Sequence, residues 1–115
     1  MKEEIERLLY EAQRTKFTER RTESRHPFVR PVTIYVGTEP GMTAFAKDIS
    51  ILGIGIVSPM EFSTGSQAVL RIHSVNGTPV FLRSEARWSD AFGKGWFNVG
   101  WKFISAASPP AQAHR

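Results

Sequence analysis

The chain has 115 residues and a mass of 12.9 kDa, enough for a single domain with one modest core. It contains no cysteine and only three scattered histidines, which excludes disulfides and cysteine nucleophiles and disfavours a metal site. The net charge of +4 favours an anionic partner, and no apolar run is long enough for a membrane helix or a signal sequence. We therefore expect a cytoplasmic protein that does not insert into membranes.

The first predicted element is a helix over residues 2–16. Its apolar residues recur at helical spacing and form one narrow stripe, made of Ile5, Leu8, Leu9 and Ala12. Glutamates lie in the first turns and cations in the last turn, as the helix dipole favours. The pattern predicts an accessory helix, residues 1–17, that leans on the domain. A homodimer formed through this helix is the alternative.

Basic residues are concentrated in the segment 14–30, which has six basic residues and two acids and so carries a net charge of +4. Five of the six are arginine, whose planar guanidinium pairs with phosphate through two hydrogen bonds and stacks on aromatic bases. Residues 17–28 are polar and end near a proline, so we expect a loop that contains His26 and leads into the first strand. The candidate ligand-binding residues in this loop are Arg20, Arg21 and Arg25.

Beyond the loop, apolar residues alternate with a period of two, which predicts short strands separated by turns that contain glycine, proline or Asn76-Gly77. The predicted strands cover residues 32–36, 44–49, 53–58, 68–73, 80–88 and 97–104. Six short antiparallel strands hide their edges best by closing, so we expect a mainly β protein built as a small antiparallel barrel. Trp96 and Trp101 are predicted to be core residues. The domain is expected to span 18–106, followed by a flexible tail, 107–115.

A second pattern, residues 48–55, joins two of the predicted strands. Asp48 and Ser50 lie two residues apart and therefore face the same side of an extended chain. Gly53 and Gly55 permit either a positive φ or the close approach of a flat, bulky group. A carboxylate can accept hydrogen bonds from the donor edge of guanine, and an arginine can donate to the acceptor edge. With further arginines for phosphates, these residues suit a guanine nucleotide without a metal ion.

The two patterns together, Arg-x-x-x-Arg and then Asp-x-Ser-x-x-Gly-x-Gly, resemble the PilZ domain family. The resemblance covers residues 18–106, and no motif position departs from the family pattern. PilZ domains are bacterial receptors for the second messenger cyclic di-GMP. The resemblance therefore implies a six-stranded barrel in a stand-alone effector or adaptor that binds cyclic di-GMP, needs no other cofactor and signals to a protein partner.

The resemblance also implies a role for each matched residue. Arg21 and Arg25 are expected to wrap the ligand and contact its phosphates and guanine faces. Asp48 and Ser50 are expected to bind guanine and the ligand backbone from the barrel surface, where Gly53 shapes the turn.

Two further residues are carried over from the family. Arg20 precedes the arginine motif, and members with an arginine there tend to bind an intercalated dimer of the ligand. Trp88 resembles an aromatic residue that lies near the ligand in some members, and a core position is the alternative for this side chain.

The sequence favours three other functions less. A PilZ-like protein–protein module that binds no nucleotide is the main alternative, which the intact motifs argue against. Binding of DNA or RNA needs exposed stacking aromatics along a basic groove, whereas here the cations lie in one loop. No serine has a predicted base and acid beside it, and no carboxylates form a paired motif, so we expect no enzymatic activity.

Overall fold

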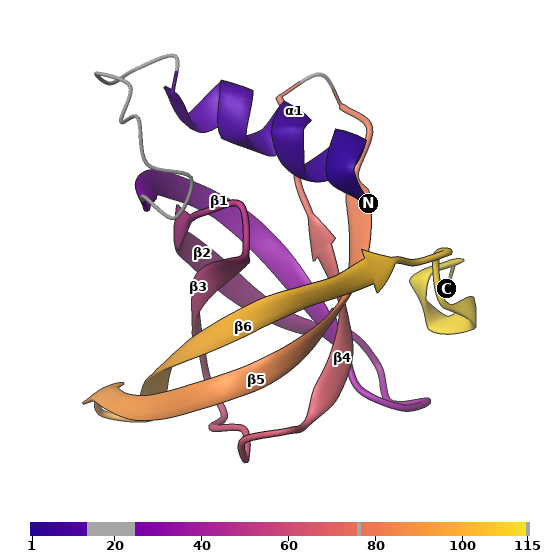
Figure 1. Ribbon diagram of the computed structural model, residues 1–115. Helices are drawn as coiled ribbons and strands as arrows, with labels where there is room; N and C mark the ends of the chain where they lie inside the picture. The colour runs from indigo at the N-terminus through magenta and orange to yellow at the C-terminus, as the bar shows by residue number, and fades with distance from the viewer. Residues whose placement is uncertain (14–24, 76, 115) are drawn as a thin grey trace.

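The computed structural model describes residues 1–13, 25–75 and 77–114 (Figure 1). In chain order the elements are α1 (Lys2–Gln13), β1 (His26–Tyr35), β2 (Met42–Ile49), β3 (Gly53–Ser58), β4 (Gln67–Ile72), β5 (Val80–Gly93), β6 (Trp96–Ala106) and the 3-10 helix η1 (Ala111–His114). Within these ranges no helix is long and apolar enough to cross a membrane.

The six strands form a closed barrel in the order β1-β2-β3-β6-β5-β4, and all neighbouring pairs are antiparallel. This confirms the predicted fold class, a mainly β chain with a six-stranded antiparallel barrel and an N-terminal helix. Closure gives each strand a hydrogen-bonding neighbour on both sides. The β3–β6 pair joins the first half of the chain to its last strand, and this junction becomes important for the site below.

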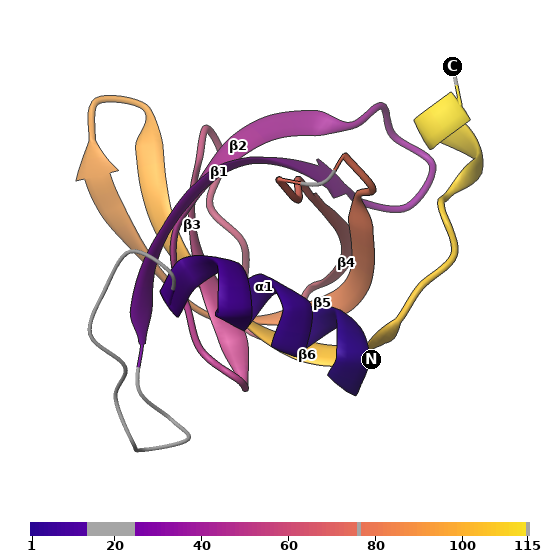
Figure 2. The same ribbon diagram turned by 90° about the horizontal axis from the view of Figure 1, so that it is seen from above.

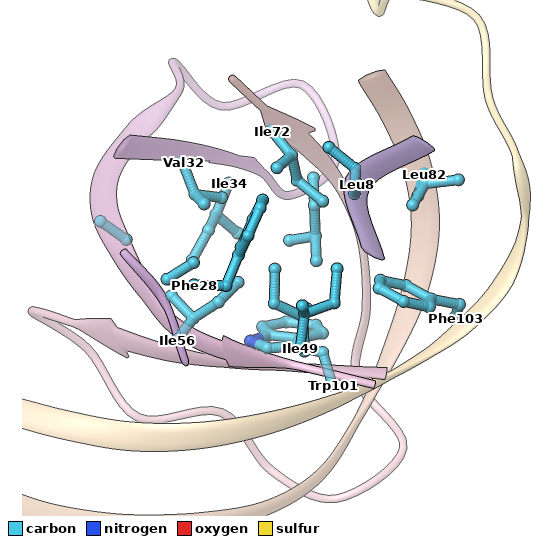
Figure 3. Close-up of a cluster of buried hydrophobic side chains, with 14 of the residues drawn as sticks. Leu8, Phe28, Val32, Ile34, Ile49, Ile56, Ile72, Leu82, Trp101 and Phe103 are labelled. Atoms are coloured by element: carbon cyan, nitrogen blue, oxygen red, sulfur yellow. The ribbon is translucent and has the colours of Figure 1, made fainter. Parts of the chain in front are cut away.

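The period-two pattern fills the barrel with apolar side chains. In β5, Val80, Leu82 and Ala86 are buried, whereas the intervening Arg83 is exposed. Successive side chains of a strand point to opposite faces, so the same alternation in the other strands directs their aliphatic and aromatic residues inward. Figure 3 shows this shared cluster, which includes Trp101 from β6.

Helix α1 lies across one mouth of the barrel (Figure 2) and completes the core. Ile5, Leu8 and Ala12 are almost fully buried and belong to the same cluster as the strand residues. Figure 3 shows Leu8 among them. The prediction that the stripe leans on the domain is therefore confirmed for residues 2–13, and residues 14–16 lie outside the described part of the chain. The homodimer through α1 stays a prediction, and the stripe that suggested it is buried within the chain.

A partly buried ion pair holds the last turn of α1 on the barrel. The Glu11 carboxylate accepts hydrogen bonds from Arg30 Nη1 at 2.7 Å, Ser74 Oγ at 2.6 Å and the Val75 amide at 3.4 Å. Arg30 Nη1 also donates to the His73 carbonyl at 3.1 Å. Burial alone would raise the pKa of Glu11, but these hydrogen bonds and the Arg30 charge outweigh it and lower the pKa below its ordinary value.

Several strand ends and two side chains differ from the sequence prediction. The first strand begins at His26, which is buried and pairs with Ile49, so His26 was wrongly predicted to lie in a loop. Strand β5 continues to Gly93 and pairs with β6 beyond the predicted ends, as a hairpin that reaches past the other strands (Figures 1 and 2). Trp96 lies at the far end of this hairpin and is 38% exposed, so its predicted core position was wrong.

The C-terminal segment contains a short helix that composition did not predict. Residues 111–114 form η1, and Gln112 Nε2 donates hydrogen bonds to the carbonyls of Gly37 and Glu39 at 2.9 and 3.0 Å. These contacts hold part of the tail against the turn between β1 and β2. The flexibility predicted for 107–115 is a statement about motion and stays a prediction.

Candidate functional site

The turn between β2 and β3 is built around the hydroxyl of Ser50. Its Oγ accepts hydrogen bonds from the amides of Leu52 and Gly53, both at 3.3 Å, and the Ser50 amide donates to the Gly53 carbonyl at 2.9 Å. Serine favours such turns because its side chain can satisfy nearby backbone groups. Ser50 is only 2% exposed. Its direct contact with a ligand stays a prediction, while its contacts within the chain are those of a turn-forming residue.

Arg25, the residue before β1, is docked on this turn. Its Nε and Nη2 donate to Asp48 Oδ1 at 2.9 and 2.6 Å, and its Nη1 donates to Ser50 Oγ at 3.2 Å. A guanidinium held through three of its nitrogens has a fixed plane and direction. The structure thus brings together Arg25, Asp48 and Ser50, which the sequence placed in two separate motifs.

Lys47 is a second cation on the Asp48 carboxylate. Its Nζ lies 2.7 Å from Asp48 Oδ2, the oxygen that Arg25 leaves open. Burial alone would raise the pKa of Asp48, but hydrogen bonds from Lys47 and Arg25, together with their charges, outweigh it and lower the pKa. Asp48 is therefore a carboxylate at neutral pH, compensated by two cations.

Asp48 and Trp88 lie at the two ends of a row that crosses four strands. The register pairs Asp48 with Gly55, Gly55 with Gly100, and Gly100 with Trp88. A Cβ at Gly55 would lie 2.6 Å from Asp48 Oδ1, and a Cβ at Gly100 would overlap the Trp88 indole. The Asp48 and Trp88 side chains therefore each lie over the neighbouring glycine, where a larger residue would collide with them.

Gly53 serves close packing of the backbone. Its φ is not positive, and a Cβ there would overlap the carbonyl oxygen of Trp101 on β6. The sequence left two roles open for this glycine, a positive φ or the close approach of another group. The structure shows close approach, and the approaching group is the backbone of β6. Gly53 therefore fixes the distance between β3 and β6 beneath the site.

A pocket of about 220 Å³ opens beside the row on the outer face of the barrel. It is lined by Arg25, Leu52, Gly53, Arg87, Trp88, Gly100, Trp101 and Lys102. Three of these residues are cations, of which Arg25 is paired with Asp48 at 2.6 Å and Arg87 with Glu85 at 2.8 Å. Trp88 is 46% exposed, which resolves the alternative left open by the sequence in favour of a surface position. An exposed indole beside cations suits a flat, anionic ligand.

Sequence reasoning found part of this site and missed the rest. Arg25, Gly53 and Trp88 line the pocket, and Asp48 and Ser50 hold Arg25 at its edge. Arg20 and Arg21 lie outside the described residues. The residues that sequence reasoning missed are Lys47, Arg87, Gly100 and Lys102. Alternation on the predicted strands could have indicated that Arg87 and Lys102 point outward. It could not have shown that the pairing of β5 with β6 brings them together. In the described ranges no three His, Asp or Glu side chains form a group that could hold a metal ion.

The family model of the PilZ domain matches residues 19–114. The chain belongs to the PilZ domain family. The match includes both motifs and all six strands of this PilZ domain, whereas α1 precedes it. The arginine and aspartate-serine motifs thus lie in the part of the chain that the family defines.

The barrel of this PilZ domain is similar to a solved structure. The Bacillus subtilis inhibitor of motility (MotI/DgrA) matches with a TM-score of 0.62 and 20% sequence identity. The match covers 79% of this chain but 46% of that protein, so the PilZ domain described here spans less than half of its length. At this identity the likeness supports the fold alone. A comparison with curated proteins found no significant match.

Proposed function

We propose that this PilZ domain is a cytoplasmic receptor for cyclic di-GMP that signals to a protein partner. The observation that carries the proposal is the docking of Arg25 on Asp48 and Ser50 at the edge of a pocket that also contains Trp88. The acid and the arginine offer the acceptor and donor groups that a guanine edge requires. Arg87 and Lys102 add positive charge for phosphates.

The proposed mechanism is a clamp. The arginine segment closes the nucleotide against the barrel surface from Asp48 to Gly53, with the indole of Trp88 as a stacking surface. The roles proposed for Arg20 and Arg21 rest on the family resemblance. It implies that Arg21 wraps the ligand and that Arg20 favours an intercalated dimer of the ligand. The rearrangement of this segment then changes the surface that a protein partner meets.

Calorimetric titration of the full chain tests the proposal. We expect wild type to bind cyclic di-GMP in preference to cyclic di-AMP and GTP, and binding to be lost in Arg21→Ala and Arg25→Ala. Arg83→Ala is the matched control, because Arg83 is exposed on β5 and does not line the pocket. A stoichiometry of two ligands per chain that falls to one in Arg20→Ala supports the intercalated dimer.

A second candidate function is a protein-binding module without a nucleotide ligand. The observation that favours it is the group of exposed aromatic residues on the β5–β6 hairpin, Trp88, Phe92 and Trp96. Exposed aromatic side chains in one region are typical of protein interfaces. If folded wild type, verified by circular dichroism, binds none of the three nucleotides, the receptor proposal is wrong and this candidate takes its place.

A further inference from the structure

A β-bulge places Lys47 beside Asp48. Neighbouring residues of a regular strand point to opposite faces, so a lysine directly before an outward-facing aspartate normally points inward. In β2, however, the register shifts between Ala46 and Asp48, and Lys47 is the extra residue opposite β3. Bulges re-aim side chains and are common beside binding sites. Here the bulge lets the ammonium of Lys47 reach Asp48 Oδ2 at 2.7 Å.

Both carboxylate oxygens of Asp48 are therefore engaged by cations of the chain itself. Arg25 holds Oδ1 through two nitrogens, and Lys47 holds Oδ2. A guanine that donates hydrogen bonds to this carboxylate competes with these cations for positions on its oxygens. The two cations do not compete equally.

Lys47 is the cation that is easier to displace. Both side chains are exposed, Arg25 at 47% and Lys47 at 39%, so the number of contacts is what separates them. Arg25 makes three hydrogen bonds, to Asp48 and Ser50, whereas Lys47 makes a single contact with Asp48 from a flexible side chain. Exposed lysine–carboxylate pairs contribute little free energy because water competes for both partners. A ligand donor can therefore replace Lys47 at Oδ2 while Arg25 keeps its place.

We propose that Lys47 is a specificity-determining residue: it competes with guanine for the Asp48 carboxylate and so narrows the preference for guanine over adenine nucleotides. This inference rests on the proposed function. The donor edge of guanine carries N–H groups that can replace the ammonium. Adenine presents an unprotonated ring nitrogen at the corresponding place, so it leaves Lys47 on Asp48. Lys47 thus lowers the affinity for guanine nucleotides, which compete with it for Asp48, and leaves the affinity for adenine nucleotides unchanged.

Substitutions at Lys47 show whether this lysine competes with the ligand for Asp48 or instead attracts the anionic ligand by its charge. In Lys47→Met the competitor is gone, and we expect cyclic di-GMP to bind about two- to fivefold more tightly, the size of one exposed ion pair. In Lys47→Arg the carboxylate is held by a second guanidinium, and we expect weaker binding than in wild type. Lys94→Met is the matched control, since it removes the same charge from the exposed end of the β5–β6 hairpin.

The outcomes are distinct. Tighter binding by Lys47→Met and weaker binding by Lys47→Arg support the proposal. Binding that is detected for Lys47→Met but for no other protein in the set supports it as well. Equal or weaker binding by Lys47→Met, relative to Lys94→Met, overturns it. Binding by no protein in the set means that the proposed function itself has failed.

A measurement without nucleotide tests the contact directly. The carboxyl carbon of Asp48 can be titrated by nuclear magnetic resonance in the full-length chain. We expect the Asp48 pKa to rise in Lys47→Met and to stay unchanged in Lys94→Met, because only the first substitution removes a cation from Oδ2. The same Asp48 pKa in both variants would contradict the contact and with it the proposal.

Discussion

At position 100 the chain has a glycine directly beneath the indole of Trp88, and a Cβ there would overlap Nε1 and Cε2 of the ring. The indole therefore lies against the sheet because the residue under it has no side chain. Trp88 and Gly100 both line the pocket, so this contact determines how far the indole projects on that side of the pocket. Gly100 is thus a positioning residue for the proposed stacking surface.

We expect Gly100→Ala to push the Trp88 ring outward, at a cost of about 1–3 kcal/mol in the free energy of unfolding. The affinity for cyclic di-GMP should fall by about three- to tenfold, as expected for the partial loss of one stacked base. Calorimetry and urea unfolding measure the two effects.

A double-mutant cycle provides the control for this prediction. The three atoms nearest to the added Cβ all belong to Trp88, so Gly100→Ala should cost little in a Trp88→Ala background. An equal cost in both backgrounds would mean that the indole is not the obstacle.

Among the elements, α1 could not be placed from its sequence alone. Its apolar stripe was narrow enough to serve either the domain or a second copy, and the structure packs it into the mouth of the barrel. The strands were predictable because alternating burial has a local pattern. Their ends were not, since the extension of β5 to Gly93 depends on its pairing with β6, and His26 is buried by its place in the barrel.

The attachment of α1 through Glu11 should make stability depend on pH. The folded-state pKa of Glu11 is lowered, so its stabilising effect is fully present above the unfolded pKa and is lost as pH falls through the folded pKa. At neutral pH we expect Glu11→Gln to lower the free energy of unfolding by about 1.5–3 kcal/mol, the range for hydrogen bonds to a charged group.

The difference between wild type and Glu11→Gln should then shrink as pH falls below about 4, where unfolded Glu11 is protonated. Urea unfolding at several pH values measures this. Glu6→Gln is the matched control on the exposed side of α1. A pH-independent gap would show that the charge of Glu11 is not the cause.

At the scale of the whole molecule, helix and barrel share one core. Leu8 of α1 is fully buried in the same cluster as Ile72 and Leu82 (Figure 3). We therefore expect α1 and the barrel to unfold in a single transition, with the same urea midpoint by helical circular dichroism and by tryptophan fluorescence. Earlier loss of the helical signal would instead mark α1 as an independent attachment.

Two variants sharpen this expectation. Leu8→Ala should lower both midpoints together, by about 2–5 kcal/mol in the free energy of unfolding, because it leaves a cavity between helix and barrel. Tyr10→Ala should leave them unchanged, because Tyr10 is 67% exposed on the same helix.

The residues of the candidate site fall into two groups, those placed by neighbouring sequence and those placed by pairing between distant strands. Asp48, Ser50 and Gly53 were predictable because a strand–turn–strand segment places them by short-range geometry. Lys47 was not predicted as a site residue because the alternation of apolar and polar residues does not reveal where a β-bulge occurs. Arg87 and Lys102 were not predicted because their place in the pocket depends on pairings between strands far apart in the chain.

The row from Asp48 to Trp88 crosses the junction of β3 with β6, the last strand of the barrel. During synthesis the ribosome releases β6 after every other strand, so a nascent chain carries both motifs long before it has a complete site. A chain that stops before Trp96 leaves β3 and β5 without their shared neighbour, and we expect it to form neither the closed barrel nor the candidate pocket. The order of the strands thus makes closure of the barrel, and with it the candidate site, depend on β6, which follows both motifs in the chain.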